Sequence, residues 1–521
     1  MSLAQYRYTE LEFAPVQMVL TRICHGRSTW SLCLFDRARL REHFSMSDTQ
    51  MNHLYESLAA RMAEAIHAGA LKAGDRLPSV RRVSTQHRVS IATAVQAYRH
   101  LENQRLIEAR PKSGYFVLSG PVTLAEPTTS TPPATARMVG VNQLVMEVLE
   151  SALEADSVPL GAACPAQELF PTDKLLRLAH AEGRRRPQLM SAYAMSRGYE
   201  KLRSMIARRS VDAGCQLSPE EIIVTNGCIE ALNLALRAVA APGDTIALES
   251  PTYFTLLQII ESLGMKALEI PTHPRDGLSI DALDLATQKP GAVKAVIAIP
   301  NFQNPLGSLM PDENKARLVQ LCEARGIALI EDDIYGDIHF GASRPRVAKS
   351  WDRSNNVILC SSFTKTVAPG FRVGWIAPGK RFPQVAMLKF ISSVSTPELP
   401  QAAIAEFMAS GGYDHHLRRL RAGFARQVQQ TSQAIAEYFP TGTRITRPAG
   451  GFVLWVELPA GIDALELFRR ARAERISIAP GPMFTTTKRY RNCIRVGCGN
   501  LWSTKIEMGL MRLGKLAAEL A

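Results

Sequence analysis

A regular alternation of short apolar runs with longer helical stretches is the feature of this chain that most constrains its fold. The strand-like runs cover residues 222–225, 245–249, 294–299, 327–331 and 356–360, and helical stretches such as 229–240 and 311–325 lie among them. Strands that alternate with helices are typical of a mostly parallel α/β sheet, because each helix crosses over a sheet face. We therefore expect an α/β domain over residues 139–521.

The length and composition of the chain indicate more than one domain. A chain of 521 residues exceeds one ordinary core, and about 150 residues per domain gives about three units. The net charge of +13 suits a polyanionic partner, although it also occurs in proteins that bind none. Nine cysteines without a C-x-x-C pair argue against a structural zinc site and fit a reducing compartment. No apolar run approaches ~20 residues, so we expect a cytoplasmic protein without a membrane span.

The N-terminal part divides into an extension, a small domain and a linker. Residues 1–46 show no sustained period and remain an uncertain N-terminal extension. The domain that we expect over 47–119 begins with a helical stripe over about 50–68. A stretch rich in proline and threonine over 120–138 predicts an extended linker.

Two serines and a turn determine the predicted order of elements in this small domain. Ser79 and Ser90 can each cap a helix, the first ending near His87 and the second near Asn103. Strands over 106–109 and 115–118 flank a turn. Helix, helix-turn-helix and hairpin together predict a winged helix-turn-helix.

Positive charge concentrates on this predicted domain. Between Arg76 and Lys112 lie eight basic residues against two acidic ones. Phosphate contacts provide most of the sequence-independent affinity for DNA, and residues at the start of the second helix can reach the major groove. The residues that we expect to contact double-stranded DNA are Arg76, Arg81, Ser90, Thr93, Arg99, Arg110, Lys112 and Gly114.

Four short motifs resemble the GntR family of winged helix-turn-helix regulators. They are the stretch G-D-R-L-P-S-V-R at 74–81, V-S at 89–90, A-Y at 97–98 and S-G-Y at 113–115. The resemblance implies that Arg81 contacts phosphate or base and that Gly114 approaches the minor groove. The chain departs from the family at Ile91, where an arginine is common, and at Arg105, where a glycine is usual.

The sequence S-S-F-T-K at 361–365, followed by P-G-F-R-V-G at 369–374, is the strongest chemical motif. The amine of Lys365 can form a Schiff base with an aldehyde cofactor, while Ser362 and Arg372 can hold a phosphate. The strand over 327–331 leads into Asp332, which, if buried, could pair with a protonated pyridine nitrogen.

Further residues could contact other groups of the same cofactor. Tyr335 and Asn304 could each reach a phenolic oxygen, and Tyr253 offers a ring that could stack on the cofactor. The turn N-G-C-I at 226–229 leads into a helix, whose free N–H groups and dipole favour a phosphate.

In this order, the motifs resemble fold-type I pyridoxal-5'-phosphate (PLP) enzymes of the aminotransferase class over roughly 140–521. The resemblance implies Lys365 as the Schiff-base lysine, a mostly parallel central sheet and a smaller C-terminal α/β subdomain. The implied cofactor residues are Gly227, Cys228, Tyr253, Asn304, Asp332, Tyr335, Ser362 and Arg372. Arg495 matches the arginine that clamps a substrate carboxylate, and Tyr193 matches the tyrosine that reaches the partner subunit's phosphate. A domain-swapped homodimer is implied, and Cys228 is a departure, since Ser, Ala or Thr is commoner there.

The fusion of the two domains resembles the MocR subfamily of GntR regulators. As the resemblance implies, an amino acid or amine effector would exchange with Lys365 at the aldimine and reposition the DNA-binding domains. An active aminotransferase that carries a DNA-binding domain remains an alternative, because all catalytic-type residues are present. A cofactor-free binding module is a third reading. Turnover with 2-oxoglutarate, effector-dependent DNA affinity and absorbance after PLP addition distinguish the three.

Overall fold

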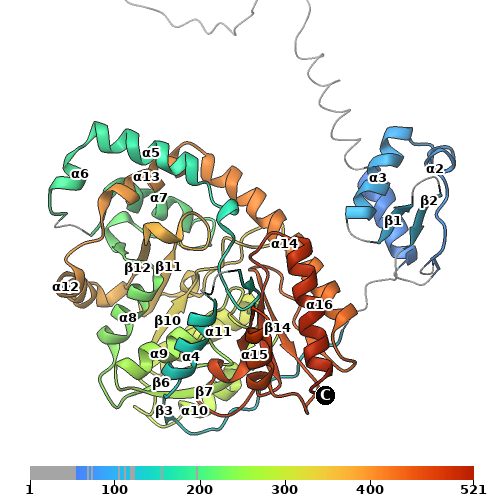
Figure 1. Ribbon diagram of the computed structural model, residues 1–521. Helices are drawn as coiled ribbons and strands as arrows, with labels where there is room; N and C mark the ends of the chain where they lie inside the picture. The colour runs from blue at the N-terminus through green and yellow to red at the C-terminus, as the bar shows by residue number, and fades with distance from the viewer. Residues whose placement is uncertain are drawn as a thin grey trace, which may run out of the picture. The chain divides into compact units, whose positions relative to one another are not determined.

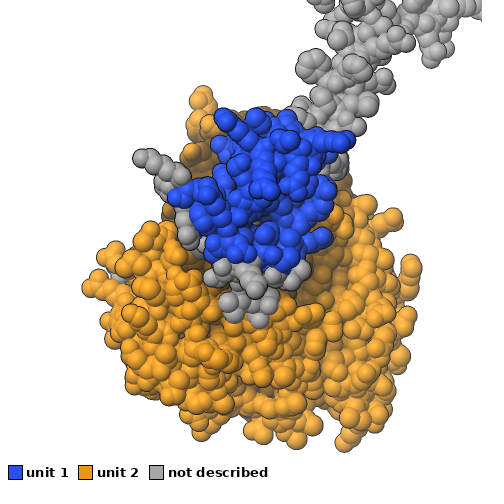
Figure 2. Space-filling model, turned by 90° about the vertical axis from the view of Figure 1, so that its right-hand side faces the viewer, with its two compact units in different colours: residues 1–120 blue, residues 121–521 orange. Residues whose placement is uncertain are grey.

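The computed structural model describes residues 54–66, 70–71, 74–103, 106–110, 113–117, 124–152, 154, 156–194 and 197–521. The N-terminal extension over 1–46, Arg105 and Lys112 lie outside these residues. The chain divides into two compact units, unit 1 over residues 1–120 and unit 2 over residues 121–521 (Figure 2).

Unit 1 contains the predicted winged helix. Residues 54–66 are helical, and α2 (Val80–His87), α3 (Ile91–Asn103), β1 (Ile107–Arg110) and β2 (Gly114–Val117) follow. The strands pair in antiparallel fashion, with Ile107 opposite Val117. The predicted caps form, since Ser79 Oγ accepts from the Arg82 N–H at 3.3 Å and Ser90 Oγ accepts from the Thr93 N–H at 3.0 Å.

The core of unit 1 lies under the inner face of α3. Tyr98 is fully buried, stacks on Tyr115 with ring centroids 4.8 Å apart, and donates its hydroxyl to the Pro78 carbonyl at 2.6 Å. This hydrogen bond ties α3 to the start of α2. The other buried side chains of this core are Leu58, Ala59, Ile66, Leu77, Val83, Ala94, Ala97, Leu101, Leu106, Ile107 and Val117.

Unit 2 is built on a nine-stranded sheet. Its strands, in spatial order, are β3 (Arg137–Met138), β7 (Lys266–His273), β6 (Thr245–Ser250), β9 (Ala295–Ala298), β10 (Ala328–Asp332), β11 (Val357–Ser362), β12 (Gly374–Ala377) and β5 (Ile223–Thr225), with β8 (Gly277–Leu278) beside β7. Strands β7, β6, β9, β10 and β11 are parallel neighbours, whereas β12 is antiparallel to both of its neighbours. The predicted mostly parallel sheet is therefore present.

Helices cover both faces of this sheet, as alternate residues of β9 show. Ala295 and Ile297 face a core shared with α8 (Cys228–Val239) and α9 (Phe254–Ser262), whereas Val296 and Ala298 face a core shared with α10 (Ile280–Ala286) and α11 (Asp312–Ala324). A strand buried on both faces reads as a continuous apolar run, which explains the pattern in the sequence. The remaining helices of the main body are α4 (Asn142–Ala152), α5 (Thr172–Arg185), α6 (Gln188–Ser191), α7 (Glu200–Ser210), α12 (Phe382–Ser393) and α13 (Glu398–Ala409).

The C-terminal part of unit 2 forms the smaller subdomain. Its four-stranded antiparallel sheet contains β13 (Arg444–Ile445), β14 (Val453–Glu457), β17 (Cys493–Gly497) and β16 (Ala479–Pro480). Its helices are α14 (Gly412–Tyr438), α15 (Ala464–Ala473) and α16 (Thr504–Ala518), and α14 and α16 lie side by side (Figure 1). The short β4 (Val158–Pro159) pairs in parallel with β15 (Ile476–Ser477).

The predicted linker over 120–138 lies against unit 2 along its described part. The Ser130 N–H donates to the Thr272 carbonyl at 3.2 Å, and the Ile445 N–H donates to the Ala125 carbonyl at 3.0 Å. Strand β3 then joins the edge of the sheet through β7. Residues 124–138 therefore belong to unit 2 and are held against the rest of it by these backbone contacts. Among all described residues, no helix is long and apolar enough to cross a membrane.

Candidate functional site

The predicted cofactor residues follow strands that end at one edge of the sheet. Asp332 ends β10, Ser362 ends β11 and precedes Lys365, and Gly227 lies between β5 and α8. Carboxyl ends of parallel strands meet at the same edge, and open α/β sheets bind ligands there. The topology thus brings together residues that lie as far as 138 positions apart in the sequence, and the contacts described next join them into one site.

Asp332 is a buried carboxylate that needs a cation. Only 3% of its surface is exposed, and its Oδ1 accepts from the Cys228 thiol at 3.4 Å and from the Ile334 N–H at 3.2 Å. Burial raises the pKa of Asp332 to about 7, although both hydrogen bonds oppose this shift. A protonated pyridine nitrogen would supply the missing positive charge.

The amine of Lys365 points toward the same space. Its Nζ donates to the Ala163 carbonyl at 2.6 Å. Burial lowers the pKa of Lys365; the guanidinium groups of Arg495 and Arg372 act in the same direction, while Cys164 and Asp332 oppose them. A lowered pKa increases the share of neutral amine, which is the nucleophilic form.

Arg495 lies in β17 at the other side of the site. Its Nη1 donates to Asn304 Oδ1 at 3.0 Å, and its Nη2 donates to the Gly161 carbonyl at 2.7 Å. The residue is 3% exposed, and its buried Nε has no hydrogen-bond acceptor among the residues that the structure describes. Burial lowers the pKa of Arg495, Tyr335 and Tyr253 oppose this shift, and no carboxylate of the described residues forms a salt bridge with the guanidinium. Such a guanidinium suits a ligand carboxylate.

Asn304 connects this arginine to Tyr335. The Asn304 Nδ2 group lies 3.5 Å from the Tyr335 hydroxyl, and both side chains are buried. Burial raises the pKa of Tyr335, which keeps its hydroxyl protonated as a donor. The structure therefore joins Asn304, Tyr335 and Arg495 in one buried hydrogen-bonded group.

The turn before α8 forms a cradle lined by backbone. Gly227 caps α8 with a φ of 81°, and no described side chain caps the helix. A Cβ at Gly227 would lie 2.4 Å from Arg372 Nη2, so glycine lets this guanidinium lie close to the turn. Arg372 itself adopts a left-handed backbone and donates to the Asn226 carbonyl at 3.2 Å. Free helix N–H groups beside a guanidinium favour a phosphate.

Three predicted cofactor residues differ in how directly they join this cradle. Ser362 is buried at the end of β11, where its Oγ accepts from the Thr364 N–H at 3.3 Å. Tyr253 is half-buried immediately before α9 and interacts electrostatically with Arg495 and Asp332. The Cys228 thiol donates to Asp332 Oδ1 at 3.4 Å, which leaves the Cys228 backbone N–H for a phosphate.

Tyr193 stands apart from the other cofactor residues. Its side chain is 85% exposed and lines a surface hollow together with residues 395–400. An exposed tyrosine cannot complete the site of its own subunit from this position, and the prediction that it serves a partner subunit remains a proposal.

Sequence reasoning missed the backbone that covers the site. The carbonyls of Gly161 and Ala163 accept from Arg495 and Lys365, two residues apart on one extended segment after β4. A carbonyl carries no side-chain signature, so the sequence offers no signal for this contact. Phe484, with the Arg495 guanidinium 5.1 Å from its ring centroid, was missed for a similar reason, because it reads as an ordinary core residue.

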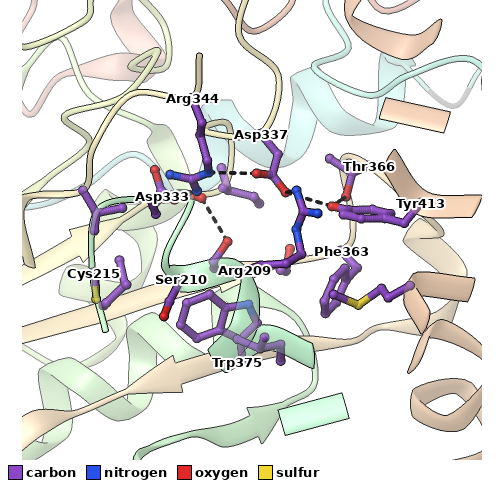
Figure 3. Close-up of a pocket in the computed structure, with 18 residues that line it drawn as sticks. Arg209, Ser210, Cys215, Asp333, Asp337, Arg344, Phe363, Thr366, Trp375 and Tyr413 are labelled. Atoms are coloured by element: carbon purple, nitrogen blue, oxygen red, sulfur yellow. Dashed lines mark hydrogen bonds and ion pairs between the residues drawn. The ribbon is translucent and has the colours of Figure 1, made fainter. Parts of the chain in front are cut away.

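A buried charge network contacts Thr366, the residue that follows Lys365 (Figure 3). The Tyr413 hydroxyl of α14 contacts Asp337 Oδ2 at 2.9 Å and Thr366 Oγ1 at 3.2 Å. Arg344 pairs with both Asp333 and Asp337. The cavity among these residues measures about 50 Å³, which suits one or two water molecules rather than a cofactor. The network therefore positions the loop and is not a second ligand site.

In unit 1, most described DNA-contact candidates are exposed. Arg76 lies beside the wing, since a Cβ at Gly114 would be 3.5 Å from its Nε, and Arg81, Ser90 and Arg99 are open to solvent. Arg110 ends β1, whereas its side chain and Lys112 lie outside the described residues.

The expectation for Thr93 needs correction. Thr93 is 3% exposed, and its hydroxyl lies 2.8 Å from Ser90 Oγ inside the cap of α3. Its position on the inner side of the helix directs it to the core of unit 1, so its side chain serves the fold rather than DNA.

Comparisons with known proteins agree with both halves of the chain. Residues 167–513 match the family described as aminotransferase class I and II, and residues 54–117 match the bacterial regulatory proteins of the gntR family. The HTH-type transcriptional regulators YjiR and YdcR of Escherichia coli are 39% and 38% identical to this chain. The matches cover 88% and 89% of this chain and 98% and 99% of those proteins.

The solved structures show the same fold for unit 2. The α-aminoadipate aminotransferase LysN of Thermus thermophilus, complexed with N-(5'-phosphopyridoxyl)-L-leucine, is 29% identical with a TM-score of 0.66. The match covers 72% of this chain and 94% of that one. The predicted fold class is thereby confirmed. Since a gntR-family DNA-binding unit precedes an aminotransferase domain of class I and II, the chain belongs to the MocR-type GntR transcription regulators.

Proposed function

We propose that this regulator binds PLP at Lys365 and senses an amino acid through that cofactor. The observation that carries the proposal is a connected set of buried charges around one space. Asp332 forms no salt bridge and Arg495 Nε has no acceptor among the described residues, and the Lys365 amine interacts electrostatically with both side chains. No single one of these groups identifies a cofactor. The pyridine nitrogen of PLP would pair with Asp332, however, and the carboxylate of an amino acid would pair with Arg495.

The residues present fit PLP at each of its polar groups. Asp332 would hold the pyridine nitrogen, Tyr335 and Asn304 the phenolic oxygen, and the Gly227 turn with Ser362 and Arg372 the phosphate. When bound, PLP supplies an aldehyde carbon that reacts with primary amines. The close approach of the Arg372 guanidinium to the turn at Gly227, which a Cβ would block, supports a phosphate site there.

An amino acid effector would compete for contacts that the protein makes internally. Its carboxylate would take Arg495 Nη2 from the Gly161 carbonyl, and Arg495 Nε would gain an acceptor. Its amine would compete with Lys365 for the cofactor, leaving the Lys365 amine free to hold a proton. Because Gly161 and Ala163 lie on one segment, both exchanges act on the same stretch of backbone. Such a segment can favour one arrangement without ligand and another with it.

An aminotransferase activity is the second candidate. Relatives include the 2-aminoadipate transaminase of Thermus thermophilus, which is 30% identical over 71% of this chain and 92% of that enzyme. The residues that would hold PLP are compatible with turnover as well as with sensing. The regulator is favoured because the chain also carries an intact winged helix with a basic surface.

We also propose a domain-swapped homodimer. Helix α12 exposes Met387, Phe390 and Ile391 at 64%, 48% and 62% of their surfaces, and Ile229 of α8 is 44% exposed. Apolar patches of this kind on a folded protein are typical of protein contacts. A second copy bound there would lie near the turn at Gly227, because Gly227 and Ile229 both lie at the start of α8. Tyr193 could then reach the phosphate site of the partner subunit.

The test of the sensing function compares wild type with Lys365→Ala. We expect the wild type to show the absorption of lysine-bound PLP and to change its DNA affinity when an amino acid is added. Lys365→Ala should lose the absorption band and the response while keeping its DNA binding. Steady transamination with unchanged DNA affinity would instead support the enzyme.

A further inference from the structure

The outward face of α3 is chemically unusual for a helix that binds a polyanion. Opposite its buried face, α3 presents Ile91, Ala92, Val95, Gln96 and Arg99. Ile91 is 55% exposed in the first turn, and Val95 is partly exposed one turn later. Burying Ile91 against the core is impossible from this side of the helix, because Thr93, Ala94, Ala97 and Tyr98 already form the inner face. An exposed aliphatic stripe here needs an apolar partner.

The charges around this face indicate that the partner is DNA. Arg81 and Arg82 at the start of α2, Arg88 in the turn and Arg76 beside the wing are all exposed. Basic residues that surround a helix can contact the phosphates on both sides of a major groove, which directs the helix itself to the base edges. A protein or lipid partner would not explain four arginines around five residues of helix surface.

Base chemistry then limits what this face can recognise. In the major groove, the only apolar group at a base edge is the C5-methyl of thymine, and the pattern of adenine suits a bidentate contact from Gln or Asn. Guanine is read best by Arg or Lys in two-pronged contacts. Of the five outward residues, three are aliphatic and one is Gln96, whereas the single arginine lies in the third turn of α3.

We propose that the first two turns of α3 read an A·T-rich half-site, with Ile91, Ala92 and Val95 against thymine methyl groups and Gln96 on adenine. This inference rests on the DNA binding of the regulator and adds its base preference. The buried cap formed by Ser90 and Thr93 supports it, because the cap fixes the backbone of the first turn and thereby the position of Ile91.

The experiment selects DNA sites from a random duplex library with the full-length protein. We expect the recovered half-sites to be A·T-rich at the positions that α3 covers. Replacing individual thymines of the selected site by uracil removes only the methyl group, and each contacted position should weaken binding by about fourfold. Gln96→Ala should relax the preference at one A·T pair by about 5-fold or more.

Two controls keep the outcome interpretable. In Ile91→Ala the uracil effect should disappear at one position, whereas binding to random DNA at low salt should stay unchanged. Glu64→Gln, on the outer side of the first helix, should behave as wild type. Selected sites with G·C pairs under α3, or equal affinity for thymine and uracil duplexes, would overturn the proposal while leaving DNA binding intact. Failure to bind any duplex would refute the DNA-binding function itself.

Discussion

Asp332→Asn in protein freed of PLP gives a sharp test of the charge balance in the candidate site. Asparagine keeps the shape of the side chain and its acceptor oxygen but does not titrate. In the wild type, burial raises the Asp332 pKa from 3.8 to about 7. Between these values the folded protein holds a proton that the unfolded chain has released, so the wild type loses stability as the pH rises through this window.

The size of the loss follows from the shift. Each pKa unit corresponds to ~1.36 kcal/mol, and the interval from pH 5 to pH 8 contains about two units of the window, which gives ~3 kcal/mol. Asp332→Asn lacks this pH-dependent contribution to the free energy of unfolding. We therefore expect Asp332→Asn to gain about 3 kcal/mol in free energy of unfolding relative to wild type when the pH is raised from 5 to 8.

The assay is urea unfolding followed by tryptophan fluorescence at several pH values, with Asp212→Asn as the exposed control. Burial raises the pKa of Glu331 to about 7, and its titration cancels in the difference because Asp332 does not influence it. Burial raises the pKa of Glu249 to about 8 with a smaller contribution from Asp332, so Asp332→Asn lowers the Glu249 pKa and adds a smaller gain of the same sign. Saturating PLP should remove most of the pH-dependent loss of stability in the wild type. PLP should bind Asp332→Asn more weakly than it binds the wild type. Stability curves that remain parallel from pH 5 to 8 would refute the reasoning.

Three further predictions address other parts of the account. Gly227→Ala should weaken PLP binding by at least tenfold in a fluorescence titration, because its Cβ would meet Arg372. The control Gly411→Ala has a similar φ but open space around its Cβ, so it should carry only the backbone strain and keep its PLP affinity. Equal PLP affinities of the two variants would contradict a phosphate site at Gly227. Arg495→Gln should raise the effector concentration needed for a spectral change by tenfold or more without reducing PLP affinity, and an unchanged effector titration would remove Arg495 from the carboxylate site. Tyr98→Phe should destabilise unit 1 by about 1–3 kcal/mol, measured as a lower melting temperature of the winged helix, because the Pro78 carbonyl loses its donor; an unaltered melting curve would refute this role.

The sequence predicted the elements of both units well because their local signals agree with their tertiary roles. Ser79 and Ser90 cap α2 and α3 as expected, and β10 and β11 appear in the sequence as apolar runs because helices cover both faces of the sheet. Asp332 was predictable because it ends a strand at the ligand-binding edge, and Lys365 and Asn304 were predictable because they follow strands that end there.

Other features depend on contacts that no local pattern encodes. The carbonyls of Gly161 and Ala163 cover the site from a segment about 200 positions or more before Lys365 and Arg495. Thr93 resembles a DNA-contact residue in sequence, yet its place on the inner side of α3 buries it. Cys228 turns its thiol to Asp332 because α8, which begins at Cys228, packs against β10, the strand that Asp332 ends.

The central claim is that an amino acid bound in unit 2 controls DNA binding by unit 1. The most direct measurement is the Kd of the full-length, PLP-loaded protein for its selected DNA site, with and without each of a panel of amino acids and amines, in wild type and Lys365→Ala. The account predicts that at least one compound shifts the wild-type Kd by about 5- to 150-fold and leaves that of Lys365→Ala unchanged. An unchanged wild-type Kd with every compound, together with steady transamination at about 1 per second or faster, would contradict it.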